Sequence, residues 1–342
     1  MIDFRYHLVS IVAVFLALAL GIVLGSTELQ PAAYRFLNST TAKLQNELNQ
    51  VSSQRATAQQ QANAGESYAQ AVEPAVLHDL LAGHRLLIVT EPGAESSVVS
   101  GIITAANDAG ASVTGQINLQ PKFFDTSATT QDSLNQTTLD VAQTASLQLD
   151  TSATYQQPAA QVIASEILTT APEPAGSPAG GGQGTAAAML QAYAASQFLS
   201  TTGQPAVPAN LVVVVTPQNA PSAGTADPLD QVLILLVQEL SAKSSATVVV
   251  GSSAGSGAGS PIAVLRSNSM SSQVSTVDDA DLASGQTVAM QALAARLAGG
   301  KAGSYGFTAN GASAIAPSPA PTPTASASAS ATPTSSTKKA KK

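Results

Sequence analysis

Few residues in this 342-residue chain could bind a metal ion. The sequence contains no cysteine, which excludes thiolate metal sites, disulfides and cysteine nucleophiles. The remaining soft or imidazole ligands are His7, His78, His84, Met1, Met189, Met270 and Met290. The methionines are widely separated, and His78 and His84 lie six residues apart rather than at the helical i,i+4 spacing. The sequence therefore assigns no metal ligands, and surface histidines are the simpler interpretation.

A glycine-rich run, Gly251–Gly259, is the one segment with the composition of a phosphate-binding loop. It follows a buried-strand pattern, and Asp278 comes about twenty residues later, at the usual distance for an acid that binds a ribose. However, Ser260 takes the place of the third glycine of G-x-G-x-x-G, and Pro261 opens only a short helical run. A flexible surface loop is the favoured interpretation, with nucleotide binding as the alternative.

Three carboxylates, Glu91, Asp278 and Asp279, follow predicted strands and could do acid–base chemistry. Because Asp278 and Asp279 are adjacent, we expect their side chains to point apart. Capping or a turn before a helix at Ser284 is the favoured role. No Ser-His-Asp arrangement is supportable, because His78 and His84 precede the first predicted strand. We therefore assign no catalytic residue and predict that the protein is not an enzyme.

The first predicted element of the chain is an uncharged apolar stretch at residues 8–27. As a helix it spans roughly 30 Å, the thickness of a bilayer's hydrocarbon core, and backbone amides in lipid must bond within the segment. We predict a transmembrane helix here. A cleaved signal peptide starting at Arg5 is the alternative, but signal cores usually run about 7–15 residues, so a retained anchor is favoured.

Charges flanking this helix predict its orientation. Arg5 precedes it and Glu28 is the first charge after it, and positive charge favours the cytoplasmic side. Residues 1–7 are therefore predicted to be cytoplasmic and the rest of the chain extracytoplasmic. A single anchoring helix favours the cytoplasmic membrane. In addition, the later predicted strands lack the alternating pattern of outer-membrane strands.

Small residues form a stripe on the predicted membrane helix. Ala13, Ala17, Gly21 and Gly25 recur every fourth residue, and the last two make a G-x-x-x-G pattern. Such residues allow two helices to approach closely. The stripe predicts pairing with a second copy, the alternative being chance, since Ala and Gly are common in membrane helices.

Residues 28–73 carry a heptad pattern. Leu37, Leu44 and Val51 recur every seven residues, and Leu48 belongs to the companion seam. Apolar residues at these spacings are typical of a parallel coiled coil, which we predict as a homodimer, with a helix starting near Pro31. A single amphipathic helix lying on its own domain is the alternative.

Residues 84–306 alternate between strand and helix patterns. Strands are predicted at 85–90, 111–119, 211–215, 246–250 and 274–277. Helices are predicted at 95–109, 131–149, 158–170, 185–199, 227–241 and 284–297. Unbroken β-branched runs such as Leu211–Val215 are expected where both faces of a strand are buried. The fold class is therefore α/β, with a doubly wound, Rossmann- or flavodoxin-like, mostly parallel sheet.

Two segments and the overall charge complete the organisation. Residues 171–184 are rich in Pro and Gly and predict a flexible insertion, and residues 312–342 form a Pro/Ser/Ala/Thr tail, ending in lysines, that predicts disorder. The net charge of −7 disfavours nucleic-acid partners, which require a basic surface.

Several motifs together resemble the actinobacterial copper transporter family typified by mycobacterial copper transport protein B. They are the N-terminal block at residues 1–26, the coiled coil directly after it, Ala109–Gly115 with Lys122–Asp125, Val274–Asp279, Ser284–Thr287 and Gly299–Gly306. The resemblance covers residues 1 to about 306. Members often carry Gly-His-Tyr-Gly in the last motif, but here Ser304 takes the place of the histidine, so no role of that histidine is transferred.

The resemblance implies a role in copper transport or copper homeostasis at the cell envelope, in either the cytoplasmic or the outer membrane. Copper enters as an ion transported or sensed, and no cofactor is predicted. The runner-up is a non-catalytic envelope scaffold or ligand-binding protein on a dimeric stalk, and an enzyme of envelope metabolism comes third. The expected partners are the membrane, a second copy and an envelope protein.

Overall fold

The computed structural model describes residues 4–149, 154–171, 183–218, 228–257 and 259–307, with only the backbone described for Phe4 and for residues 26–33 and 228–230. The predicted tail at 312–342 and most of the predicted insertion at 171–184 lie outside the described residues. The chain divides into two units, residues 1–67 and 68–342.

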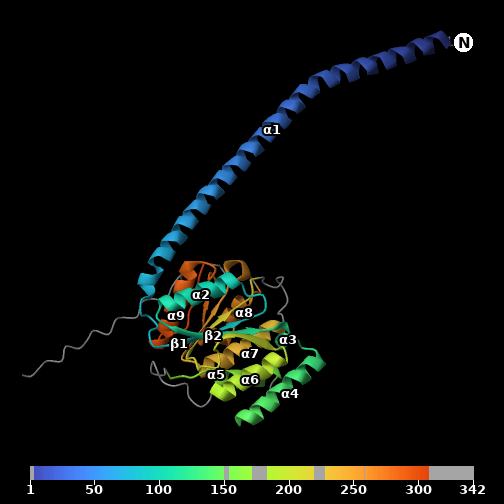
Figure 1. The fold of residues 1–342 in the computed structure, drawn as a ribbon. Coiled ribbons are helices and arrows are strands. Elements are labelled where there is room, and N and C mark those ends of the chain that lie inside the picture. Colours follow the sequence, from blue (N-terminus) through green and yellow to red (C-terminus); the bar gives the residue numbers. More distant parts are fainter. Residues whose placement is uncertain (1–3, 150–153, 172–182, 219–227, 258, 308–342) are drawn as a thin grey trace, which may run out of the picture. The chain divides into compact units, whose positions relative to one another are not determined.

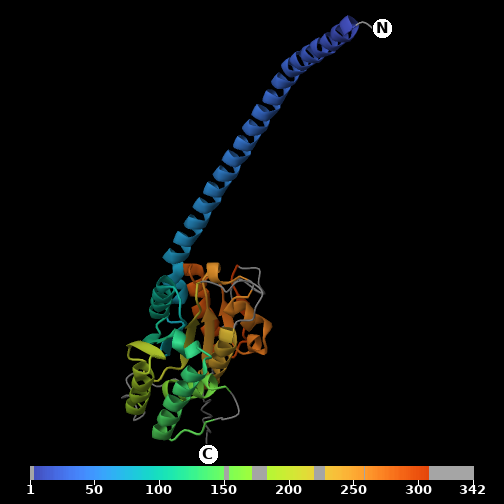
Figure 2. The same ribbon diagram turned by 90° about the vertical axis from the view of Figure 1, so that its right-hand side faces the viewer.

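The N-terminal part of the chain is a single helix, α1 (Phe4–Leu77), coloured blue in Figure 1 and Figure 2. It contains both the predicted membrane helix and the predicted coiled coil. The predicted helix start near Pro31 is wrong, because the helix continues through this position. A proline removes one backbone donor, and the hydrogen bonds on either side of it can still carry the helix past the gap.

In the described part of the second unit, seven strands form one sheet in the order β3-β2-β1-β4-β5-β6-β7. The strands are β1 (Arg85–Thr90), β2 (Ser112–Leu119), β3 (Leu199–Gly203), β4 (Leu211–Val215), β5 (Ala246–Val250), β6 (Ser275–Val277) and β7 (Ser304–Tyr305). All neighbours are parallel except β2 and β3, which pair antiparallel. The predicted mostly parallel, doubly wound sheet is confirmed, with two further edge strands, β3 and β7.

Helices cover both faces of the sheet (Figure 1). One face is covered by α2 (Ser96–Asp108) and α9 (Ala283–Leu297), whose apolar residues share a core cluster with alternate residues of β1, β4 and β5. The other face is covered by α3 (Pro121–Phe124), α4 (Ala128–Ala145), α5 (Gln156–Ile167), α6 (Gln183–Ala195), α7 (Pro228–Lys243) and α8 (Pro261–Ser267). Two short 3₁₀ turns, η1 (Ser253–Gly255) and η2 (Ser269–Ser272), flank α8.

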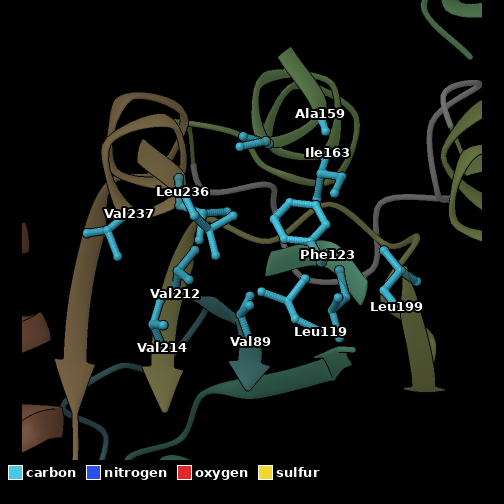
Figure 3. Packing of buried hydrophobic residues seen from close by; sticks show 14 of the residues in the cluster. Val89, Leu119, Phe123, Ala159, Ile163, Leu199, Val212, Val214, Leu236 and Val237 are labelled. Atoms are coloured by element: carbon cyan, nitrogen blue, oxygen red, sulfur yellow. The ribbon is translucent and has the colours of Figure 1, made fainter. Parts of the chain in front are cut away.

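The central strands are buried on both faces, as their β-branched sequences predicted. In β4, Val212 and Val214 belong to one core cluster, whereas Leu211, Val213 and Val215 belong to the other. Figure 3 shows Phe123 of α3 between the sheet and α5. Phe123 is fully buried, so this four-residue helix carries an anchor for the larger cluster.

Candidate functional site

The usual ligand crevice of such a sheet lies where the strand order reverses, at the carboxyl ends of β1 and β4. Here the first described residues of two loops contact each other. The Glu91 amide donates to the Val215 carbonyl at 3.0 Å, and the Gln218 amide donates to the Gly93 carbonyl at 3.2 Å. Ala94 and Pro217 also form an antiparallel bridge. The loops after β1 and β4 therefore bind each other across this position.

The glycine-rich run after β5 is held by its own hydroxyls and by a carboxylate. Asp281 accepts hydrogen bonds from the Ser253 amide at 2.8 Å and from its hydroxyl at 2.6 Å. The buried Ser256 hydroxyl lies 2.7 Å from the Ser252 carbonyl oxygen and 3.1 Å from the Asp278 carbonyl oxygen, and either can accept its proton. The predicted flexible surface loop is therefore wrong for residues 251–257. Because a carboxylate already binds the Ser253 amide, this geometry does not support a phosphate-binding loop.

Asp278, which follows β6, forms a buried ion pair with Arg266 of α8. Arg266 Nη1 lies 2.6 Å from Asp278 Oδ2, and the side chains are 4% and 0% exposed. The same guanidinium donates to the Thr276 hydroxyl at 2.9 Å and to the Tyr305 carbonyl at 2.7 Å. One arginine thus ties together α8, β6 and the C-terminal strand β7.

Asp279 is also buried, but its Oδ1 has no hydrogen-bond partner among the described residues. Burial and the neighbouring Asp278 carboxylate raise the pKa of Asp279 to about 6. The sequence suggested that one of the two aspartates caps the following helix. This is wrong, because the N-cap of α9 is Leu282. The alternative of a turn is confirmed, because the Asp279 carbonyl accepts from the Leu282 amide at 3.0 Å.

Three of the motifs that carry the family resemblance converge on these aspartates. The Phe307 amide donates to Asp278 Oδ1 at 3.0 Å, and a Cβ at Gly306 would overlap that carboxylate. A Cβ at Gly285 would overlap the Asp279 carbonyl in the same way. Glycine is therefore required where the segments 284–287 and 303–306 approach 274–279. Both carboxylates are buried, and these contacts join three segments that are distant in sequence.

The motifs Ala109–Gly115 and Lys122–Asp125 also make structural contacts. Gly115 of β2 is needed because a Cβ would lie 2.6 Å from the Thr202 carbonyl oxygen of β3. Lys122 lies 4.7 Å from the centre of the Phe198 ring and donates to the Ser196 carbonyl at 3.0 Å. These contacts fix α3 and the edge strand β3 to the sheet.

Within the described residues of the second unit, the candidate metal ligands lie in different surroundings. His78 is exposed beside Asp79, with Nδ1 and Oδ2 3.2 Å apart, and His84 Nδ1 accepts from the Asn210 amide at 2.7 Å when its proton is on Nε2. Buried methionines lie in both core clusters: Met189 and Met270 in one, Met290 in the other. Within the described residues, no group of three or more His, Asp or Glu side chains could hold a metal ion. His7 lies in α1, and Met1 is outside the described residues.

The predicted pairing residues are all exposed in the single chain. Ala13, Ala17, Gly21 and Gly25 are exposed, and a Cβ added at either glycine would meet nothing within 4 Å. The apolar seam is 55–66% exposed at Leu37, Leu44, Leu48 and Val51. The segment Arg5–Gly25 is long and apolar enough to cross a membrane, which suggests membrane anchoring. Pairing itself stays a prediction.

Comparison with known proteins identifies the family. Residues 1–317 match the family described as "Copper transport outer membrane protein, MctB". Proteins called "Copper transporter MctB" from Mycobacterium tuberculosis and Mycobacterium bovis are each 27% identical over 319 residues, covering 92% of this chain and 99% of the relative. The protein of that name from Mycobacterium leprae is 26% identical over 329 residues. The family model matches most of this chain, and the alignments cover the relatives almost completely. This chain therefore belongs to the MctB copper transport family.

Proposed function

We propose that this protein is a membrane-anchored copper transport or copper homeostasis protein of the cell envelope. The observation that carries the proposal is the family match over residues 1–317, which includes both α1 and the α/β domain. The family is one of copper transporters and not of enzymes. The burial of Asp278 and Asp279 supports a non-catalytic role as well, because acid–base chemistry needs carboxylates that a substrate can reach.

The proposed topology places the amino terminus in the cytoplasm and the α/β domain outside it. Arg5 lies at the start of the apolar segment, and Glu28 is the first charge after it. Positive charge favours the cytoplasmic side. The family description names the outer membrane, whereas an anchoring α-helix favours the cytoplasmic membrane. Fractionation of the membranes decides between the two. Reporter fusions after residue 70 should be active only as exported enzymes, and cytoplasmic reporter activity there would overturn the topology.

The proposed assembly is a parallel homodimer. Exposed Leu37, Leu44 and Val51 share a heptad seam on α1, the same helix that carries the small-residue stripe from Ala13 to Gly25. An exposed apolar seam at a spacing of seven residues is buried when two such helices coil around each other. A stripe of small residues lets the membrane segments of the two chains approach closely. One helix thus provides both pairing devices.

The proposed copper role is indirect and requires an envelope protein partner. The methionines described are buried in core clusters, where a thioether is a packing group. The two histidines between α1 and β1 do not form a ligand cluster with other described residues. One anchoring helix in each chain also cannot enclose a channel without many copies. We therefore place copper movement in a complex that this protein recruits or supports.

A clean deletion strain tests the proposed function. Plated on graded copper and, in parallel, on envelope stressors such as detergent and lysozyme, it should show selective copper sensitivity that the wild-type gene reverses. Copper tolerance equal to the parent strain would contradict a copper role. Equal sensitivity to every stressor would favour the second candidate, a non-catalytic envelope scaffold, which the contact between the loops after β1 and β4 also suits.

A further inference from the structure

A pocket beside α2 departs from the apolar pattern of the sheet. It has a volume of about 310 Å³ and lies between α2 and the carboxyl ends of β1 and β2. Its lining residues are Thr90, Glu91, Ala94, Ser96, Val99, Ser100, Ile103, Gln116 and Asn118. The pocket adjoins the β1–β4 crevice and shares Glu91 and Ala94 with the loop after β1. Six of these nine residues are polar. Three of the six, Thr90, Gln116 and Asn118, belong to β1 and β2, although the helix-covered face of a central strand normally carries apolar residues.

A β-bulge places the polar side chains on this face. Leu86 pairs with Val113 and Leu87 pairs with Gly115, so Thr114 is an extra residue in β2. Before the bulge, Val113 packs in the α2 and α9 cluster; after it, Ile117 and Leu119 pack in the opposite cluster. Their neighbours Gln116 and Asn118 therefore face α2. Bulges that redirect side chains in this way are common next to functional sites.

The polar groups are already ordered by hydrogen bonds. The Thr90 hydroxyl donates to Asn118 Oδ1 at 2.8 Å, and the Gln116 amide donates to the same oxygen. Thr90 is 5% exposed, so this network continues into the buried layer. A preorganised polar network loses little conformational entropy when it binds a ligand.

The composition of the lining indicates the class of ligand. Hydroxyl and amide side chains both donate and accept, and vicinal hydroxyl groups of a sugar or cyclitol do the same. Glu91 adds a buried carboxylate, which accepts hydrogen bonds and disfavours an anion. Within the described part of the chain, no Lys, Arg or His is among the lining residues, so the lining offers no cation to an anionic group. Val99, Ile103 and Ala94 supply an apolar wall for the ring carbons.

We propose that this pocket binds a neutral polyhydroxylated molecule of the size of one sugar or cyclitol ring. The proposal goes beyond the copper role and does not depend on it. The result of the copper-plating test and the result of the binding test below are therefore independent of each other.

The test is ligand-observed saturation-transfer NMR on the full-length protein in a detergent without a sugar headgroup. Glucose, N-acetylglucosamine and myo-inositol serve as probes, and spermidine tests an amine instead. At least one polyol should bind with a saturable Kd in the millimolar range or tighter. Binding of spermidine alone, or of none of the probes, would overturn the proposal.

Two variant pairs locate the binding. Ser100→Phe fills the pocket from the exposed side of α2 and should weaken binding at least about tenfold, whereas Thr104→Phe, one turn further on and outside the lining, should not. Asn118→Leu should weaken binding by a similar factor, and Gln120→Leu on the same strand end should not. Equal effects within each pair would contradict the assignment. Unfolding curves establish that each variant is folded.

Discussion

Arg266 Nη1 and Asp278 Oδ2 lie 2.6 Å apart in a part of the domain where both side chains are buried. The pair joins α8 to the end of β6, and the guanidinium also binds the carbonyl of Tyr305 in β7. Strand β7, the last one in the described residues, is only two residues long, so it depends on this contact and on its pairing with β6. The ion pair therefore holds the C-terminal end of the α/β domain in place.

Removal of one partner of this pair should be strongly destabilising. Arg266→Met leaves the Asp278 carboxylate buried without its counter-charge, and breaking a buried pair in this way costs about 3–5 kcal/mol. Denaturant unfolding followed by tyrosine fluorescence measures the loss. Lys43→Met is the control, since Lys43 and Glu47 form an exposed pair at 3.9 Å, and such pairs contribute little. An unfolding midpoint for Arg266→Met equal to that of the control would show that the pair is not structural.

Asp279 should make stability depend on pH. Its pKa is raised from 3.8 to about 6, so between these values the folded protein holds a proton that the unfolded chain has released. The free energy of unfolding should therefore fall as pH rises through this window and level off above it. Asp279→Asn removes the buried charge and should stabilise the domain at pH 7 by on the order of 2 kcal/mol.

The measurement for Asp279 is the unfolding midpoint at several pH values from 4.5 to 7. The variant should lose this part of the pH dependence. Asp132→Asn, an exposed aspartate on α4, is the matched control and should behave as wild type. A pH profile identical in wild type and Asp279→Asn would show that the buried carboxylate does not titrate in this range.

The dimer should weaken when either pairing device is changed. Gly21→Ile with Gly25→Ile adds bulk to the small-residue stripe, and Leu44→Lys places a charge in the heptad seam. Light scattering in mild detergent should show a smaller dimer fraction for both. Controls on the opposite helix face are Ala19→Ile with Val23→Ile, and Asn46→Lys. A strictly monomeric wild-type protein would rule out the dimer.

Direct Cu(I) binding by the purified full-length protein should be weak, with a Kd in the high micromolar range or above. The reason is the absence of a ligand cluster among the described residues. Competition with a chromogenic Cu(I) chelator measures the affinity. Changing Met189, Met270 and Met290 to Leu should leave it unaltered. Sub-nanomolar affinity that is lost with His78→Ala and His84→Ala would instead identify this chain as a copper carrier.

The central part of the fold could be predicted from local sequence. The strands β1, β4 and β5 are apolar runs buried on both faces, and their predicted bounds agree with the structure. Strand β3 was missed because Ser200–Gly203 is polar and exposed, as is typical of an edge strand. The predicted helix at 185–199 also ended where this strand begins. Strand β7 has two residues and no periodicity to detect.

The closing contacts could not be predicted, because they join residues distant in sequence. Nothing near Asp278 indicates that its partner is Arg266, and nothing in the run from Gly251 indicates that Asp281 binds the Ser253 amide. The bulge at Thr114 likewise depends on pairing with β1. Sequence reasoning placed Glu91, Asp278 and Asp279 at the correct edge of the sheet, but burial decides what they can do there.

Cell-associated copper, measured by mass spectrometry, tests the central claim most directly. Parent, deletion and complemented strains are grown at a copper concentration that inhibits none of them, with zinc and iron measured as controls. A copper transport role predicts that the deletion changes the copper content, that zinc and iron stay constant, and that the wild-type gene restores the parental value. Copper content equal in all three strains would contradict a role of this protein in copper transport.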